Sequence, residues 1–174
     1  MDLLDSVIKP YIVDNCTYCR PDSGLKPFGG MVLELWRGGL ERQWAWVENF
    51  TQPSDFILVS NPKTIQEEYR FICAEGREIV AASKYKSRYV LDVSIAVPEA
   101  ARIKCQEILD TGFCPDPMFV LDLCKGADNN YYLLEVNAFS TAGLYDCDLK
   151  AVVAKASEIA WKKNQEYWRE TLSS

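Results

Sequence analysis

The 174-residue chain contains no histidine. Every Ser-His and Cys-His mechanism is therefore excluded, because the side chain that would activate the nucleophile is missing. Any acid–base chemistry would have to come from carboxylates, lysine, tyrosine or cysteine.

Basic patches and long apolar runs are missing as well. The net charge is −6 and the pI about 4.8, and the basic residues are scattered, which argues against a nucleic-acid-binding protein. No stretch approaches the roughly 18 apolar residues that indicate a membrane span. The first ten residues, MDLLDSVIKP, are acidic and lack the features of a signal peptide. We therefore expect a cytoplasmic protein with no membrane partner and no nucleic-acid partner.

The cysteines do not form a disulfide or zinc pattern. There are seven, an odd number spread along the chain, which is typical of a reduced intracellular protein. Cys16 and Cys19 form a C-x-x-C, but a four-ligand zinc site would need a second pair from distant cysteines. We favour neither structural zinc nor redox chemistry at this position.

The remaining composition suits a folded domain. Hydrophobic residues make up 48% of the chain and aromatic residues 12%, so a substantial core can form. The length fits one domain of good size, with room for two lobes. Strands, a helix, more strands and a final helix follow one another, which predicts the α+β class. The expected elements are a buried strand over 56–59, a hairpin over 64–85, a helix over 97–112, a hairpin over 118–138 and a helix over 149–172, while 40–50 is either helix or strand.

Both predicted helices have recognisable ends. Pro98 suits a first turn and Gly112 a C-terminal cap. In the last helix, Asp146 or Asp148 is the expected N-cap. The apolar faces that we expect to be buried are Ala101, Cys105, Ile108 and Leu109 in the first helix, and Leu149, Val152, Val153, Ala156, Ile159 or Ala160, and Tyr167 in the second.

The hairpin over 118–138 carries the most informative polar residues. Asp122 interrupts the apolar run MFVLDLC, and a carboxylate in such a run needs a partner. Glu135 and Asn137 lie two residues apart on the next strand, so they share one face. If the two strands pair, Asp122 faces them, and two carboxylates with an amide oxygen suit Mg²⁺. The alternative is that these are lone acids on the solvent side of a half-exposed hairpin.

Two further stretches carry charge in a suggestive setting. Arg20 and Lys26 flank a glycine-containing loop (RPDSGLKPFGG) whose backbone could approach a phosphate closely, although it lacks the P-loop pattern. A surface hairpin with two solvated cations is the alternative. Glu68 and Arg70 share one face of the hairpin over 64–85, where they could form a simple surface salt bridge.

Four of these stretches together resemble the ATP-grasp superfamily, in the compact bacterial and phage form related to amino-acid and peptide ligases. RPDSGLKPFGG resembles the loop that covers the phosphates, and FILVSNP the strand and hinge that hold adenine. EEYRFICAEGREIVAASKY resembles the E-x-R hairpin. VLDLC with LLEVNAFSTAGLY resembles the metal hairpin and the substrate loop that follows it. The resemblance extends from about residue 9 to 160, and the last two motifs are the most specific.

The resemblance implies a fold of two lobes, about 1–60 and 61–174, each with an antiparallel sheet and helices, and a nucleotide between them. It also implies a role for individual residues. The implied magnesium ligands are Asp122, Glu135 and Asn137; the implied nucleotide contacts are Arg20, Lys26, Val59, Ser60 and Glu68 (or Glu67); the implied catalytic residues are Arg70 and Lys26; and the implied substrate contacts are Ser140, Thr141 and Gly143.

The activity implied by this family is ligation that depends on ATP and Mg²⁺. A substrate carboxylate would form an acyl phosphate, and an amine would then displace phosphate to give an amide. The substrates would be small molecules or peptides. The superfamily's usual N-terminal domain is largely missing from this sequence, so a non-catalytic ATP-binding module that works with a partner subunit is an alternative. An interaction protein that keeps the fold without the site is another.

Two further expectations follow. The five tryptophans and an exposed lobe edge leave a homodimer open. Replacing Asp122 by asparagine should abolish metal-dependent nucleotide binding while leaving the fold intact, and should even stabilise the metal-free protein by relieving the repulsion between crowded carboxylates.

Overall fold

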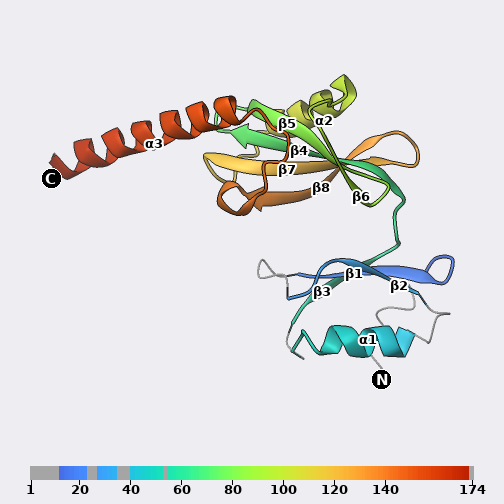
Figure 1. Cartoon of the computed structure of the whole chain (residues 1–174). Coiled ribbons are helices and arrows are strands. Elements are labelled where there is room, and N and C mark those ends of the chain that lie inside the picture. Colours follow the sequence, from blue (N-terminus) through green and yellow to red (C-terminus); the bar gives the residue numbers. More distant parts are fainter. Residues whose placement is uncertain (1–11, 23–26, 35–39, 53–54, 173–174) are drawn as a thin grey trace. The chain divides into compact units, whose positions relative to one another are not determined.

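The computed structural model describes residues 12–22, 27–34, 40–52 and 55–172 of the chain (Figure 1). Its contacts divide the chain into two compact units, residues 1–63 and 64–174. Each unit contains an antiparallel sheet and at least one helix. The predicted α+β class is confirmed.

The first unit has a three-stranded sheet with the order β2-β1-β3. Its elements are β1 (Cys16–Pro21), β2 (Met31–Glu34), helix α1 (Leu40–Glu48) and β3 (Ile57–Ser60). The segment whose conformation the sequence left open is thus a helix. A small core forms between α1 and the sheet, and its buried members are Cys19, Phe28, Leu33, Trp44 and Val47.

Two sequence expectations for this unit need comment. The strand predicted to be buried over 56–59 begins one residue later, and Phe56 (79% exposed) and Leu58 (43% exposed) face outward. The prediction was wrong because β3 lies at the edge of its sheet and has one covered face only. Cys16 and Cys19 lie three residues apart on β1, which places them on opposite faces, and neither forms a disulfide.

The second unit contains a five-stranded antiparallel sheet with the order β6-β5-β4-β7-β8. The strands are β4 (Ile65–Ala74), β5 (Glu78–Ser87), β6 (Val90–Ser94), β7 (Met118–Gly126) and β8 (Tyr131–Ala138). Both predicted hairpins are present. The β4–β5 turn contains Gly76 and Arg77, which both have positive φ angles (82° and 65°), as two-residue hairpin turns require.

Two helices cover opposite faces of this sheet (Figure 1). Helix α2 (Glu99–Asp110) packs on one face, and helix α3 (Leu149–Leu172) begins on the other. The α2 face is apolar, with Tyr69, Phe71, Leu121 and Leu123 against Ala101, Cys105 and Leu109 of the helix. The α3 face is apolar at one end of the strands only, where Ile72, Val120 and Met118 meet Val152 and Ile159. The other end of that face is polar.

The helix ends agree with the sequence analysis. Pro98 precedes α2, and Gly112 follows it with a left-handed φ of 84°, as expected of a C-terminal glycine. Asp148 caps α3 by accepting hydrogen bonds from the backbone N–H groups of Lys150 (2.9 Å) and Ala151 (3.2 Å).

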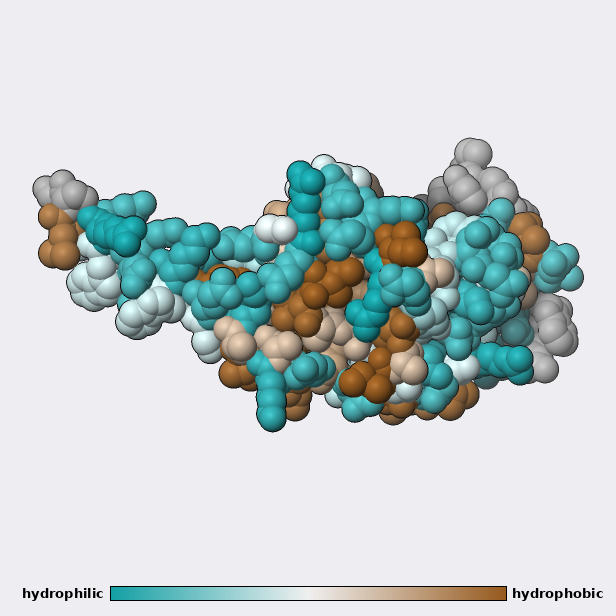
Figure 2. All heavy atoms as spheres, turned by 90° about the horizontal axis from the view of Figure 1, so that it is seen from above, coloured by the Kyte–Doolittle hydropathy of each residue, from teal (hydrophilic) through white to brown (hydrophobic). Residues whose placement is uncertain are grey.

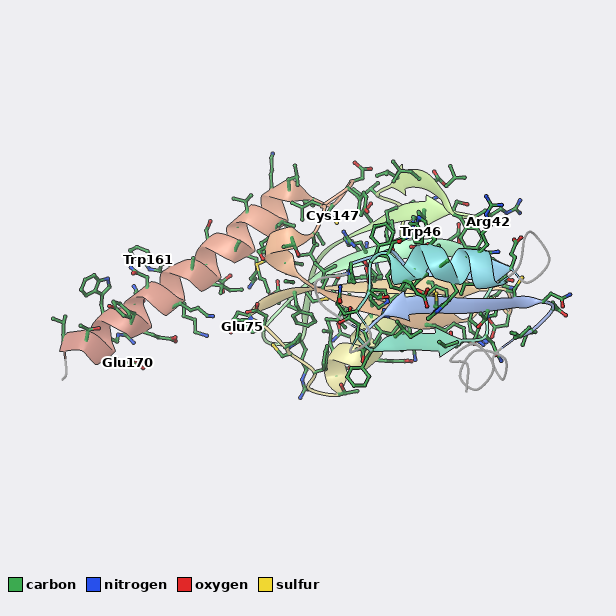
Figure 3. The ribbon with its side chains drawn as sticks, turned by 90° about the horizontal axis from the view of Figure 1, so that it is seen from below. Arg42, Trp46, Glu75, Cys147, Trp161 and Glu170 are labelled. Carbon is green, nitrogen blue, oxygen red and sulfur yellow. The ribbon has the colours of Figure 1, made fainter. Side chains whose placement is uncertain are left out.

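The expected apolar stripe of α3 is only partly correct. Val152 and Ile159 are buried, whereas Leu149, Val153 and Tyr167 are exposed. The reason is that the sheet covers only the N-terminal half of the helix, while the far end of α3 extends beyond it (Figures 1 and 3). Figure 2 shows brown apolar side chains close to the start of this helix and mostly teal ones along its length. No described helix is long and apolar enough to cross a membrane.

Candidate functional site

Four polar side chains form a row across the second sheet. Ser83 on β5 pairs with Arg70 on β4, Arg70 pairs with Asp122 on β7, and Asp122 pairs with Glu135 on β8. Residues that pair directly across antiparallel strands point to the same face. The row therefore lies on the α3 face, beyond the apolar region that the helix covers. The sheet brings together residues up to 65 positions apart in the sequence, from Arg70 to Glu135.

Arg70 and Asp122 form a buried ion pair at the centre of the row. Arg70 Nε donates to Asp122 Oδ1 (2.8 Å) and Nη2 donates to Oδ2 (2.6 Å), which is a bidentate pairing. Arg70 is 7% exposed and Asp122 is fully buried. This contact corrects the expectation that Arg70 might simply pair with Glu68: the partner of Arg70 is Asp122, directly opposite on the neighbouring strand.

The carboxyl group of Asp122 is poised between opposing influences. Burial raises its pKa, Arg70 lowers it, and the nearby carboxylates of Glu135 and Glu68 raise it further, so that the net shift is upward. A further cation next to Asp122 would therefore favour the ionised carboxylate.

Glu135 and Asn137 complete the predicted metal set. Asn137 Nδ2 donates to Glu135 Oε1 (2.8 Å) and lies 3.4 Å from Asp122 Oδ2. The three side chains predicted as magnesium ligands therefore meet at one point. A bulge in the β7–β8 pairing directly after Asp122 separates this polar pair from the Leu123–Leu133 pair.

The set fits a magnesium ion in its chemistry. Two carboxylates and an amide supply the oxygen ligands that Mg²⁺ prefers, and an octahedral ion keeps further positions for water and phosphate. Turning the Asn137 amide by 180° would direct its oxygen, in place of its nitrogen, towards the two carboxylates. Among the described residues, no three His, Cys, Asp or Glu side chains gather to form a metal site, so the amide is needed as the third ligand.

Glu68 lies further along the same face of β4. It accepts a hydrogen bond from the hydroxyl of Tyr85 (2.6 Å) and forms an ion pair with Lys86 (3.6 Å). A bulge in the β4–β5 pairing at this point lets two successive residues of β5 reach the same carboxylate. Glu68 itself is buried, so it is part of the polar cluster and not a solvated surface acid.

Sequence reasoning missed two aromatic residues of the site. The rings of Tyr85 and Tyr145 stack with centroids 4.9 Å apart and planes 8° from parallel. The guanidinium carbon of Arg70 lies 5.3 Å from the centre of the Tyr85 ring and 5.0 Å from that of Tyr145. Nothing in the sequence indicated either residue, because one lies at a bulge and the other in a loop.

The segment after β8, residues 139–148, borders the site; we call it the 139–148 loop. It begins with a short 3₁₀ helix, Phe139–Thr141. Gly143, predicted as a substrate contact, accepts a hydrogen bond from Arg70 Nη1 at its carbonyl oxygen (2.9 Å). Ser140 and Thr141 are exposed, and the Thr141 hydroxyl donates to the Ala138 carbonyl (3.4 Å). Cys147 is buried where the chain enters α3 (Figure 3).

The predicted nucleotide contacts of the first unit lie at one end of its sheet. Arg20 on β1 pairs with Leu58, next to the pairing of Cys19 with Val59 and of Tyr18 with Ser60. The Nε of Arg20 is buried and has no hydrogen-bond partner among the described residues. In that part of the chain β3 has a neighbouring strand on one side only, so half of its backbone groups point away from the sheet. Lys26 lies outside the described residues.

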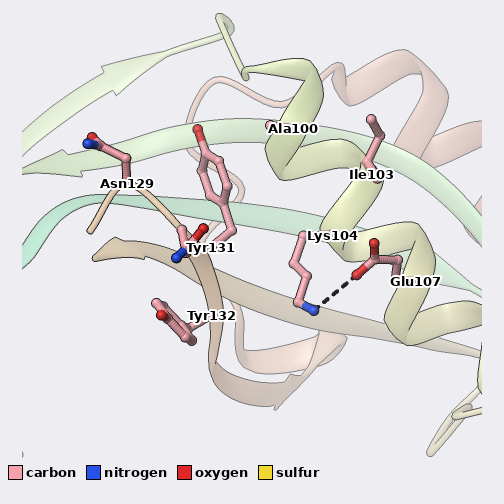
Figure 4. A pocket seen from close by; sticks show the side chains of 8 residues that line it. Ala100, Ile103, Lys104, Glu107, Asn129, Tyr131 and Tyr132 are labelled. Carbon is pink, nitrogen blue, oxygen red and sulfur yellow. Dashed lines mark hydrogen bonds and ion pairs between the residues drawn. The ribbon is translucent and has the colours of Figure 1, made fainter. Parts of the chain in front are cut away.

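A hollow of about 410 Å³ lies elsewhere on the second unit (Figure 4). Helix α2, the β7–β8 turn and the start of β8 line it, with Lys104, Glu107 and Tyr131 among the residues that face it. Lys104 pairs with Glu107 at its rim (3.0 Å). None of the candidate site residues contributes to this hollow.

Comparison with known families decides the relationship of the chain. Residues 12–156 match a family of ATP-grasp domains, the third family of its clade. The chain belongs to this ATP-grasp family. The two antiparallel sheets with their helices are accordingly the ATP-grasp fold. No curated protein matches the chain.

Solved ATP-grasp structures share the fold. The ATP-grasp ligase PsnB, complexed with precursor peptide PsnA2 and AMPPNP, is 20% identical with a TM-score of 0.53, over 87% of this chain and 48% of that chain. PsnB complexed with a phosphomimetic variant of the minimal precursor, Mg and ADP is 17% identical with a TM-score of 0.51, over 83% and 46%. This ATP-grasp chain spans about half the length of PsnB, and at such identities the likeness shows the fold.

Proposed function

We propose that this ATP-grasp chain is a ligase that uses ATP and Mg²⁺ to join a carboxylate to an amine through an acyl phosphate. The observation that carries the proposal is the convergence of Asp122, Glu135 and Asn137 next to Arg70, on one face of the sheet. Oxygen ligands for a hard cation and a guanidinium for phosphate thus lie together in a chain of this family.

Asp122, Glu135 and Asn137 would hold the magnesium ion, which, when bound, neutralises charge on the β- and γ-phosphates of ATP. In this proposal Arg70 binds the transferred phosphoryl group or the acceptor carboxylate. Three of its five N–H groups are engaged by Asp122 and Gly143, so two remain for a substrate oxygen. The remaining assignments are Arg20, Lys26, Val59, Ser60 and Glu68 to the nucleotide, and Ser140, Thr141 and Gly143 to the acceptor.

The reaction needs no general base of the histidine type. One oxygen of the acceptor carboxylate attacks the γ-phosphorus, the bond to the bridging oxygen breaks, and ADP leaves. The amine then attacks the acyl carbon, phosphate leaves, and the nitrogen loses a proton. Both steps depend mainly on alignment and on stabilisation of negative charge. Lys26 and Arg70 are the side chains of this chain to which we assign that stabilisation.

PsnB is solved with a precursor peptide, and we extend that substrate class to this chain: the acceptor is a peptide carboxylate. A cytoplasmic location and a homodimer stay predictions. The alternative function is a nucleotide-binding module that is completed by a partner, and it is favoured by the span of about half of PsnB.

The test is ADP and phosphate release by the purified chain with ATP, Mg²⁺ and a panel of carboxylates, amines and acidic peptides. We expect release that needs both Mg²⁺ and an acceptor and that falls at least a hundredfold in Glu135→Gln. The matched control is Glu107→Gln, which removes an exposed acid from α2 and should keep wild-type rates. Mg-dependent ATP binding without release under any condition would favour the alternative, and wild-type rates in Glu135→Gln would contradict the metal assignment.

A further inference from the structure

The guanidinium of Arg70 is held from several directions. Asp122 takes Nε and Nη2, and the Gly143 carbonyl takes one N–H of Nη1. These hydrogen bonds lie in the plane of the group and fix where its edge points. They do little to restrain tilting of that plane, which depends on what packs against its faces.

Tyr85 and Tyr145 supply that packing, but they differ in their own support. The Tyr85 ring is buried (5% exposed), and its hydroxyl donates to Glu68. Tyr145 is 41% exposed, and no described hydrogen bond involves its hydroxyl. Tyr145 therefore does not fill a core. Its contacts are the parallel stack on Tyr85 and the approach to Arg70.

The backbone at Tyr145 is unusual as well. Its φ is +51°, in the left-handed region that a bulky side chain rarely occupies. The neighbouring residues hold it there: the Asp146 N–H donates to the hydroxyl of Ser83 (3.3 Å), and Cys147 is buried in the core under α3. A strained conformation kept by its surroundings, at a residue whose ring is half exposed, points to a role other than packing.

We propose that Tyr145 is a positioning residue for Arg70. Together with Tyr85 it fixes the plane of the guanidinium, so that the two unused N–H groups of Arg70 are directed at the terminal phosphate of ATP. The proposal rests on the proposed nucleotide function. It adds that the 139–148 loop acts on the phosphate through Arg70, by the Gly143 carbonyl and the Tyr145 ring, as well as by direct contact.

The first test needs no nucleotide. The Nε–H resonance of Arg70 should exchange slowly with solvent in the wild-type protein, because it is buried in the pair with Asp122. We expect about tenfold faster exchange in Tyr145→Ala and near wild-type exchange in Tyr145→Phe, which keeps the ring. Equal exchange in all three proteins would overturn the proposal.

The second test compares affinities for Mg-ATP and Mg-ADP by calorimetry. A wild-type preference for ATP should shrink about tenfold in Tyr145→Ala while the Kd for ADP stays within about twofold, and Tyr145→Phe should keep the preference. Tyr145→Gly separates folding from positioning, because glycine relieves the φ strain: it should melt no lower than Tyr145→Ala and still lose the preference.

The outcomes are distinguishable from those that bear on the proposed function. A wild-type protein that binds no Mg-nucleotide would refute the nucleotide site itself. A wild-type preference for ATP that survives in Tyr145→Ala would refute only the positioning role. Loss of ADP and ATP affinity in equal measure, with a lower melting temperature, would assign Tyr145 a merely structural role and also refute it.

Discussion

The two faces of the five-stranded sheet are built by the same strands and yet have opposite characters. On the α2 face, β4 and β7 contribute Tyr69, Phe71, Leu121 and Leu123 to a dry core. On the α3 face the alternate residues of the same strands include Glu68, Arg70 and Asp122. Alternation along a strand is enough to separate a core from a polar site by the thickness of one sheet.

The comparison teaches that burial has a different consequence on each face. Burying Leu121 removes apolar area from water and stabilises the fold directly. Burying Asp122 removes a charge from water, and the cost is offset only because Arg70 forms two hydrogen bonds with it. The site face therefore depends on pairs, whereas the core face depends on volume.

The largest expected effect on the site face comes from Asp122→Asn. It leaves the buried guanidinium of Arg70 without its counter-ion, so we expect a loss of about 3–5 kcal/mol in the free energy of unfolding. This corrects the sequence-based expectation that the substitution would leave the fold untouched or stabilise it, because the pairing with Arg70 outweighs the repulsion between carboxylates. Urea unfolding measures the difference.

The neighbouring residue on the opposite face is the matched comparison. Leu121→Ala should cost about 2–5 kcal/mol through lost packing and a cavity, while the affinity of the remaining folded protein for Mg-ATP stays unchanged. A drop in stability below about 1 kcal/mol for Asp122→Asn would contradict the account of the buried pair.

The double substitution Arg70→Met and Asp122→Leu sharpens the comparison. It makes the centre of the site face resemble the core face, and replacing a buried ion pair by apolar residues of similar volume is often neutral or stabilising. We expect most of the stability lost in Asp122→Asn to return, within about 2 kcal/mol of wild type, and no Mg-ATP binding at all. A double variant as unstable as Asp122→Asn would show that the site face cannot be repacked.

A smaller effect should follow pH. Burial is the main cause of raised pKa values for Tyr69 on the core face and Tyr85 on the site face. Above the ordinary tyrosine pKa of about 10, the unfolded chain loses protons that the folded chain keeps, so stability should fall as pH rises further. The expected loss is about 1 kcal/mol per tyrosine by about pH 11. Tyr85→Phe should flatten the fall in melting temperature between about pH 9 and 11, and an unchanged slope would contradict the burial of its hydroxyl.

The smallest effect is expected for Gly143→Ala. A Cβ at this position would meet Arg70 Nη1 at 3.9 Å and Tyr145 Cζ at 4.0 Å, which is ordinary contact. The carbonyl that binds Arg70 belongs to the backbone and stays in place. We expect stability and Mg-ATP affinity within about 0.5 kcal/mol of wild type, and a larger change by calorimetry would mean that the loop packs more tightly around the site.

The sequence permitted most of the sheet and the centre of the site to be predicted. The spacing of Glu135 and Asn137 placed them on one face of a strand, and the hairpin placed Asp122 opposite them. Glycine and turn residues at 76 and 126–130 marked both hairpins. These predictions held because strand alternation and turn chemistry are local properties of the chain.

The parts that escaped prediction depend on irregular or long-range structure. Tyr85 reaches Glu68 through a bulge, which strict alternation does not foresee. Tyr145 and Gly143 meet Arg70, more than 70 positions earlier in the sequence, through a loop whose path only the folded core under α3 determines. The exposure of Phe56 and of the far half of α3 followed from how much of each element the sheets cover, which periodicity alone cannot give.

The most direct test of the central claim is a thermal melt of wild type, Glu135→Gln and Glu107→Gln, each with and without Mg²⁺ and ATP. At a ligand concentration a hundredfold above Kd, wild type should gain about 2.7 kcal/mol, or roughly 5–10 °C in Tm for a domain of this size. We predict that gain in wild type and in Glu107→Gln, only when Mg²⁺ and ATP are both present, and no gain in Glu135→Gln. An equal gain in Glu135→Gln, or one that needs no Mg²⁺, would contradict the assignment of Asp122, Glu135 and Asn137 as the metal site.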